Sequence, residues 1–477
     1  MAQDAPTVAR VEKWGLRLLA LGASVTALVL VLASVMLADY IYLAPIALLA
    51  IGAMAYLLTH LDHFLWVVIL LFGFTADFDA GVQLSEVAFL ILYVVFTAVW
   101  SIVRVGAQPG LLVATLQDRL VLWFIIYLSL AFGLGIVQGA KFATAANMAY
   151  VYSLLVLYFP LKEYALRSKH GLRFLLGVVV FFGVAALIRN LLVLRLALSD
   201  AAYAWEVATG RVAVNEMLLY ASATLTWAWM LVESKRWNQR VLFALASLLS
   251  LGVVLTQFRS YYVALALALV IIAIAVDTRG RRSLLWSGSG ALVLGSVVLY
   301  AMLGNLLILL VGGLIERLAS LGSVGTDGSL VNRFYESAAI WDLIKNNPIA
   351  GYGLGVEFGF FSILDKGTWV KTFAHNTYLM LWYRFGLLGG LLFLSLIVIT
   401  IAHGFRAYKQ SDLPRSTRFI GLALAATQVG MLPTHLAAAS YNTPDTIVLL
   451  AILLAMGAVL QEQRMSTVIR QGPAKVL

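Results

Sequence analysis

Residues 377–401 read TYLMLWYRFGLLGGLLFLSLIVITI, with Arg384 as the only charged side chain. A helix needs about 20 apolar residues to cross the hydrocarbon core of a membrane, so this stretch predicts a membrane-spanning helix. Comparable apolar runs occur at 18–37, 41–58, 64–75, 87–103, 120–137, 143–160, 174–198, 217–232, 241–256, 261–276, 284–310, 419–436 and 446–460, of which 64–75 is short. The sequence therefore predicts an all-α integral membrane protein with about 12–14 transmembrane helices.

The composition agrees with this class. Of the 477 residues, 62% are hydrophobic and 12% are charged, and the mean hydropathy is +0.94. A soluble domain carries about 25% charged residues, so a soluble fold is excluded. Cysteine is absent, which also excludes disulfide frameworks, thiol catalysis, zinc–thiolate sites and iron–sulfur clusters.

The net charge of +10 reflects the expected topology. Cytoplasmic loops are enriched in Lys and Arg, and the basic residues cluster in alternate connections, for example at 162–173, 235–240 and 406–418. We therefore expect both termini in the cytoplasm and no nucleic-acid partner. The first apolar run exceeds the about 7–15 residues of a signal-peptide core, so we interpret it as an uncleaved first span.

One connection is much longer than the others and divides the chain. Residues 1–310 are predicted to form the first set of transmembrane helices, 311–373 a large structured loop on the outer face, and 374–477 the last transmembrane helices. Most other connections are short. The long loop either roofs an active site or is a structural cap, and composition alone does not decide between the two.

Two short amphipathic helices are predicted inside this loop. Residues 314–321 have apolar side chains at helical spacing, which favours a helix on the membrane surface. A second helix is capped by Asp327 or Ser329 and ends at 346–348. Its apolar face is expected to contain Val331, Phe334, Tyr335, Ala338, Trp341 and Ile344. After it, glycines at 351, 353 and 355 permit backbone turns that other residues disfavour.

Four arginines lie on the outer face, where basic residues are disfavoured: Arg189, Arg211, Arg259 and Arg333. Each has a structural explanation, such as snorkelling of Arg259 to the headgroups or pairing of Arg333 with Glu336. Together they indicate an anionic ligand, and a diphosphate at the membrane surface fits their chemistry.

His375 lies where the long loop re-enters the membrane, at the start of the span quoted above. A neutral imidazole there can accept a proton from a substrate hydroxyl, although a purely structural hydrogen bond is the alternative. His60 and His63 lie on the inner side, so no metal site is predicted.

These residues fall into motifs. The segment Ala374-His375-Asn376-Thr377-Tyr378-Leu379, followed by Gly386-Leu387-Leu388-Gly389, resembles the signature of the bacterial O-antigen ligase and O-antigen polymerase superfamily. Residues 348–353, 256–260, and Arg211 with Asn215 are similar to three further elements of that superfamily. The resemblance covers 210–389. It departs at Tyr383-Arg384-Phe385, where the family often has an acid, and at Ser260, where Gly is more usual.

The resemblance implies a metal-independent, GT-C-like transferase without a cofactor. Such an enzyme moves a glycan from an undecaprenyl diphosphate carrier to an acceptor hydroxyl at the periplasmic face of the inner membrane. By this resemblance His375 is the base, and Arg211 and Arg259 bind the diphosphate. The residues expected to contact substrate are Arg333, Arg189, Asn215, Asn376 and Tyr352.

Several functions remain open at this stage. An O-antigen ligase joins the glycan to lipid A–core, whereas a polymerase uses a second lipid-linked glycan as acceptor, and a protein Ser or Thr is a third acceptor. A transporter or lipid flippase is the alternative from another class. Transporters usually have internal repeats and polar groups at the membrane midplane, whereas here the polar residues gather at one surface, which favours an enzyme.

Overall fold

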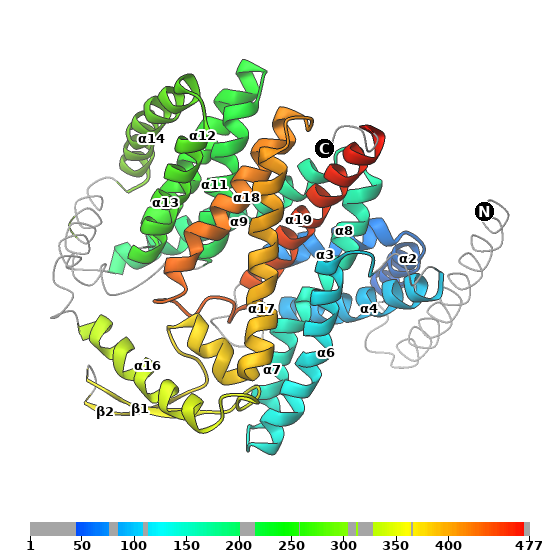
Figure 1. Cartoon of the computed structure of the whole chain (residues 1–477), viewed down its shortest axis with the longest axis vertical. Helices are drawn as coiled ribbons and strands as arrows, with labels where there is room; N and C mark the ends of the chain where they lie inside the picture. The colour runs from blue at the N-terminus through cyan, green and yellow to red at the C-terminus, as the bar shows by residue number, and fades with distance from the viewer. Residues whose placement is uncertain are drawn as a thin grey trace. The chain divides into compact units, whose positions relative to one another are not determined.

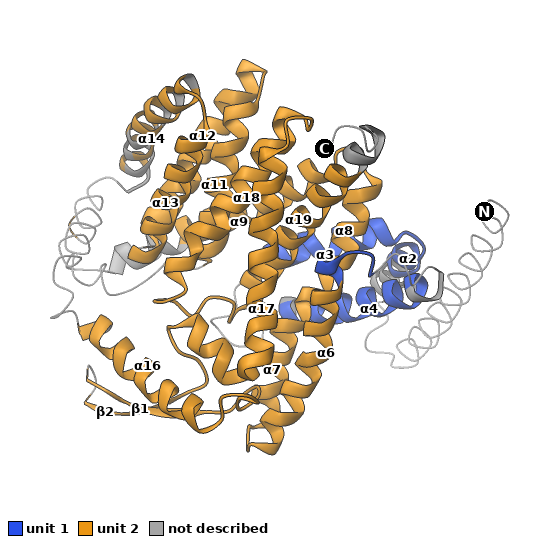
Figure 2. Ribbon diagram, viewed as in Figure 1, with its two compact units in different colours: residues 1–118 blue, residues 119–477 orange. Residues whose placement is uncertain are grey.

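The computed structural model describes residues 44–75, 84–107, 113–200, 215–256, 258–303, 312, 328–363 and 366–471. The predicted span at 18–37, the predicted loop helix at 314–321 and Arg211 lie outside these residues. The chain forms two compact units, 1–118 and 119–477 (Figure 2). Both boundaries expected from the sequence, at 310 and at 373, fall within the second unit.

In the first unit, α2 (Ala44–Thr59) and α3 (Leu61–Thr75) are bent by 116° at a break between them. The third helix, α4 (Leu84–Ala107), packs on α3 through aromatic pairs, with Phe64 and Phe96 having ring centroids 5.2 Å apart. The short apolar run at 64–75 is thus one arm of a bent pair, which explains why it is too short to cross a membrane alone.

The second unit is a bundle of helices (Figure 1). Up to the long loop its elements are α6 (Leu116–Val137, which begins just before the unit boundary), α7 (Phe142–Ser153), η2 (Leu154–Leu157), α8 (Tyr158–Arg167), α9 (Gly171–Asp200), α11 (Glu216–Val232), α12 (Arg236–Leu255), α13 (Arg259–Ala275) and α14 (Thr278–Leu303). The remaining elements are α16 (Gly328–Asn346), β1 (Phe358–Ser362), β2 (Gly367–Lys371), α17 (Thr377–Lys409), α18 (Arg415–Thr434) and α19 (Pro444–Gln471).

The predicted class is confirmed. Within the described ranges, 7 helices are long and apolar enough to cross a membrane, or up to 8 when the bent pair counts as one span. The longest of them is α17, which contains the stretch 377–401. The chain is an all-α, multi-pass membrane protein.

Helix α19 forms the centre of the second unit, surrounded by α8, α9, α17 and α18 (Figure 1). Every residue from Ile447 to Leu460 is buried. A helix that is apolar on all sides is stable when other helices cover all of it, and α19 has that composition. It begins with Asp445 at one end of the bundle, where the residues of the candidate site also lie.

Helix α17 is kinked at Gly386, whose φ is 63° and ψ is −175°. The kink breaks the regular helical ladder and releases backbone groups that need other partners. The N–H of Leu387 donates to the carbonyl of Pro348 at 3.0 Å, and the N–H of Gly353 donates to the carbonyl of Arg384 at 3.0 Å. The loop after α16 therefore completes the backbone hydrogen bonding of α17.

This loop needs its glycines. Gly351, Gly353 and Gly355 have φ of 71°, 84° and 79°, a region that favours glycine. A Cβ atom on Gly386 would lie 2.0 Å from the carbonyl oxygen of Ile349, so the loop and the kink approach within backbone contact. The expectation that glycines at these positions permit special turns is confirmed.

The predicted second loop helix is confirmed as α16, which ends at Asn346 as expected. The apolar face expected from the sequence is not the face that packs inside the protein. Phe334, Tyr335 and Trp341 are exposed, whereas Glu336 and Ile340 are buried, together with Ile344. Apolar side chains surround much of this helix, so their spacing alone fits two different faces.

The buried face of α16 packs on a short antiparallel hairpin that the sequence interpretation missed. Strands β1 and β2 pair Phe358 with Lys371 and Ser362 with Gly367. Phe358 and Phe360 alternate with exposed residues along β1 and pack with Ile340 of α16. Helix and hairpin lie together beside the first turns of α17 (Figure 1).

Candidate active site

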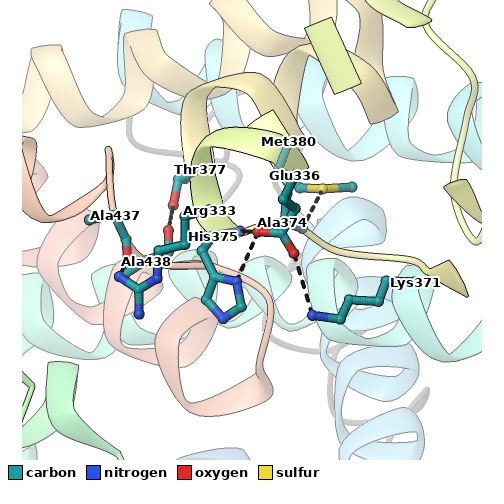
Figure 3. Close-up of polar contacts among 9 residues, drawn as sticks. All are labelled: Arg333, Glu336, Lys371, Ala374, His375, Thr377, Met380, Ala437 and Ala438. Atoms are coloured by element: carbon teal, nitrogen blue, oxygen red, sulfur yellow. Dashed lines mark hydrogen bonds and ion pairs between the residues drawn. The ribbon is translucent and has the colours of Figure 1, made fainter. Parts of the chain in front are cut away.

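His375 is held by the loop helix. Its backbone N–H donates to Oε2 of Glu336 at 2.8 Å, and its ring atom Nδ1 lies 2.9 Å from the same oxygen (Figure 3). The His375 side chain is 26% exposed and that of Glu336 is 2% exposed. One carboxylate oxygen therefore fixes both the backbone and the ring, while one edge of the ring stays accessible.

Glu336 has a second cationic partner, Lys371 at the end of β2. The Lys371 ammonium lies 3.5 Å from Oε1 of Glu336. Burial, the largest single effect, raises the pKa of Glu336, but the hydrogen bonds and charge of His375 and the charge of Lys371 together lower it below its ordinary value. Glu336 is therefore ionised in the folded protein at neutral pH and accepts hydrogen bonds only.

With Glu336 as acceptor, the proton of a neutral His375 ring lies on Nδ1. The lone pair is then on Nε2, which is the nitrogen able to accept a proton from another molecule. A carboxylate that orients a histidine in this way suits the ring to act as a general base. The catalytic role of His375 stays a prediction, and this contact is compatible with it.

The start of α17 is anchored on both sides of His375. The side chain of Asn376 caps the helix by accepting the N–H of Leu379 at 3.2 Å. The hydroxyl of Thr377 donates to the carbonyl of Ala438 at 2.7 Å. Arg333 donates from Nη1 to the carbonyl of Ala437 at 2.5 Å, which joins α16 to the same segment (Figure 3). Asn376 is thus a capping residue in this structure.

Arg259 lies at the same end of the bundle as His375. It is the first residue of α13, and its neighbour Ser260 accepts through its carbonyl a hydrogen bond from the Thr434 hydroxyl at 2.9 Å. His435, which follows Thr434 in the chain, accepts through its carbonyl a hydrogen bond from the N–H of Thr377 at 2.8 Å. The end of α18 therefore joins the starts of α13 and α17, and it brings the two predicted site residues to one region.

A third group lies at the start of α19. Nη2 of Arg189 donates to Oδ1 of Asn215, and Nδ2 of Asn215 donates to Oδ2 of the buried Asp445 at 2.9 Å. Asn215 has a φ of 61°, a conformation that asparagine tolerates better than most residues. Two residues expected to bind substrate are therefore in contact, and the chain of hydrogen bonds ends on a carboxylate.

Tyr352 has a different environment. Its hydroxyl donates to the carbonyl of Leu343 at 3.1 Å, and its ring stacks on that of Tyr383 with centroids 4.9 Å apart. These contacts join the glycine-containing loop to α16 and α17. The contacts of Tyr352 in this structure are thus with the frame of the site.

Three residues of the site were not identified as such in the sequence: Glu336, Lys371 and Asp445. Glu336 was considered only as a partner of Arg333. Its partner His375 is 39 positions away in sequence, and no local pattern reveals such a pair. Asp445 had a weak signal, because an acid in the first turn of a helix is common for reasons of the helix dipole alone.

Comparison with known proteins supports the family resemblance. Residues 243–394 match the family described as O-antigen ligase. The matched range contains Arg259, all of α16, the hairpin and His375. No curated protein matches the chain. The match covers about a third of the chain, and it supports a similarity of this part to glycan transferases of the O-antigen ligase and polymerase type.

Proposed function

We propose that this protein transfers a glycan from an undecaprenyl diphosphate carrier to an acceptor hydroxyl, as an O-antigen ligase does when it joins polymer to lipid A–core. The observation that carries the proposal is the contact of His375 with the buried Glu336. Both termini are then cytoplasmic, the protein spans the inner membrane, and the site faces the periplasm, in line with the distribution of basic loops.

In this proposal His375 accepts the proton of the acceptor hydroxyl through Nε2. The acceptor oxygen forms a bond to the first carbon of the donor sugar while the bond from that carbon to the diphosphate oxygen breaks. The electron pair of the broken bond stays on the diphosphate. Glu336 stabilises the charge that His375 gains, because its carboxylate lies 2.9 Å from Nδ1.

The arginines provide the positive charge that balances the negative charge of the diphosphate leaving group. Arg259 and Arg211 bind the diphosphate, and Arg333 and Arg189 contribute further positive charge to the same face of the protein. A guanidinium forms paired hydrogen bonds with phosphate oxygens, which suits it to this task better than an ammonium. Charge that develops on the diphosphate is then stabilised without a metal ion or a cofactor.

Substitution of the base tests the chemistry. We expect His375→Ala to lower the transfer rate by about 100-fold to 10,000-fold, the contribution typical of a general base, while binding of the lipid-linked donor is retained. Transfer by purified wild-type protein should persist in EDTA. The exposed His170 provides the control, and His170→Ala should keep wild-type activity. A fully active His375→Ala protein, or strict dependence on a metal, would refute the mechanism.

The acceptor is tested separately, with a deletion strain. Long polymer left on the carrier, together with bare lipid A–core, identifies a ligase. Single repeat units on the carrier identify a polymerase, and loss of glycan from a protein identifies transfer to Ser or Thr. Unchanged surface glycans would contradict all three and favour a transporter.

A further inference from the structure

The segment that leads from the hairpin to His375 has a regular alternation. In an extended chain, side chains two residues apart lie on the same face. Residues 369–375 read WVKTFAH, so Trp369, Lys371, Phe373 and His375 alternate with three other residues. Strand geometry places Trp369 and Lys371 on one face of β2, which ends at Lys371, and side-chain contacts place Phe373 and His375 beside them.

The contacts show that these four side chains form a continuous row. The Lys371 ammonium lies 5.0 Å from the centre of the Trp369 ring and 5.6 Å from that of Phe373. The rings of Phe373 and His375 have centroids 5.6 Å apart and meet edge to face.

The outer end of the row is accessible. Trp369 is 44% exposed and Phe373 is half-buried, whereas the Lys371 side chain is 18% exposed and lies beside Glu336. Trp369 and Lys371 lie on the hairpin face of Phe360 and Phe358, which packs on α16. The surface that the row offers to a ligand is therefore the exposed part of Trp369 and the partly exposed rings of Phe373 and His375.

The row leads away from the residues assigned to the donor. Figure 3 shows Arg333 and Lys371 on opposite sides of His375. Arg333 contacts the segment after α18, which also joins the start of α13 with Arg259. The side of Lys371 is therefore the side from which an acceptor reaches the base while the diphosphate occupies the other side.

We propose that the row formed by Trp369, Lys371 and Phe373 binds the sugar rings of the acceptor glycan and places an acceptor hydroxyl at His375. This inference rests on the proposed function. The faces of aromatic rings carry partial negative charge and attract the C–H groups of a sugar ring, and their apolar surface shields it from water. The Lys371 ammonium donates hydrogen bonds to sugar hydroxyls.

The membrane is the alternative occupant of an exposed aromatic surface, since aromatic residues gather at membrane interfaces. The row differs from such a surface because it contains a charged side chain and ends at the candidate base. The opposite face of the hairpin carries exposed apolar residues instead, Phe361 and Val370, and fits a lipid surface better. The two faces can therefore be tested against each other.

The experiment measures binding and kinetics with the full-length protein in nanodiscs. The probes are core oligosaccharide released by acid from lipopolysaccharide of the source strain and, separately, its repeat-unit oligosaccharide. We expect one of them to bind, and Trp369→Ala to raise its Kd and the acceptor KM about tenfold, as for an aromatic anchor. The donor KM should stay unchanged, and Trp369→Phe should retain most of the affinity. Val370→Ala, on the other face of the same strand, is the control and should behave as wild type.

The outcomes separate this inference from the proposed function. If His375→Ala is inactive while Trp369→Ala equals the control in Kd and KM, the row is not an acceptor site. The role proposed for His375 is then unaffected. If neither oligosaccharide binds the wild-type protein, the inference fails as well. If Trp369→Ala leaves oligosaccharide binding and the acceptor KM intact but lowers the thermal stability of the protein in nanodiscs, the row is a structural or membrane contact and the inference is wrong. A fully active His375→Ala protein would contradict the proposed function itself.

Discussion

At the scale of single residues, the central interaction is the one between Glu336 and His375. The carboxylate is buried, so its charge is useful to the fold only because His375 and Lys371 lie beside it. A carboxyl whose pKa is lowered on folding stabilises the protein at pH values above the pKa of the unfolded chain, about 4.3 for Glu, and this contribution is lost as pH falls through the lower folded pKa.

This linkage predicts the effect of Glu336→Gln. We expect the variant to be less stable than the wild type at about pH 7 and the difference in free energy of unfolding to shrink as the pH falls below about 4, where the wild-type carboxyl becomes protonated too. Chemical unfolding of both proteins in nanodiscs, at about pH 7 and below about pH 4, measures this difference in the free energy of unfolding. Glu357→Gln is the control, because its ion pair with Lys141 is exposed and contributes little. Equal stability of the Glu336 variant and the wild type at pH 7 would contradict the role of this contact.

The hydrogen-bonded chain of Arg189, Asn215 and Asp445 gives a second prediction. Asn215→Leu removes both side-chain hydrogen bonds, so Arg189 loses the group that orients it, and Asn215→Gly makes the same loss without strain because glycine tolerates the positive φ of this position. We expect the donor KM to rise about tenfold, the effect of losing a buried hydrogen bond to a charged group, with the acceptor KM unchanged. Asn238→Leu, at an exposed position of α12, should leave both values as in the wild type. An unchanged donor KM would show that Arg189 does not contribute to donor binding.

The residues of the candidate site were easier to select from the sequence than the residues that contact them. His375 and Arg259 are detectable because their types are unusual where they occur, at the ends of apolar spans. Glu336 and Asp445 are not, because an acid in a polar loop or in the first turn of a helix needs no special explanation. What makes them part of the site is a contact across tens of residues, and only the fold reveals it.

At the scale of the elements, the kink of α17 and the loop that covers it act as one unit. Gly386→Ala forces a side chain into a positive φ and against the carbonyl of Ile349, so we expect a loss of about 1–3 kcal/mol or more in stability. Gly177→Ala in α9 is the control, because no atom lies within 4 Å of its Cβ position and alanine favours a helix. Thermal unfolding compares them, and a Gly386 variant as stable as the Gly177 variant would show that the kink is dispensable.

The sequence predicted the membrane-spanning helical class and the existence of α16, because long apolar runs and helical spacing are strong signals. It did not predict which face of α16 packs inside the protein, since apolar residues lie on two sides of that helix. It also missed the hairpin, although the alternation of Phe358, Phe360 and Ser362 and the glycine at 367 are typical of paired strands. Short strands inside a helical protein are easily assigned to loops.

At the scale of the whole molecule, the distribution of basic residues predicts the orientation, and the absence of cysteine makes it easy to test. A single cysteine introduced at Lys366, in the hairpin, should react with a membrane-impermeant maleimide on intact spheroplasts. One introduced at Ser411, in the connection between α17 and α18, should react only after permeabilisation. The opposite pattern would place the candidate site in the cytoplasm and refute the proposed function.

The double hydrogen bond of His375 to one oxygen of Glu336 also has a consequence for biogenesis. Glu336 lies in the middle of α16 and His375 lies 39 positions later, just before α17, so a chain still being inserted into the membrane lacks both hydrogen bonds until this region has folded against α17. If His375 is the base, as proposed, partly folded protein has no oriented base with which to act on a lipid-linked glycan.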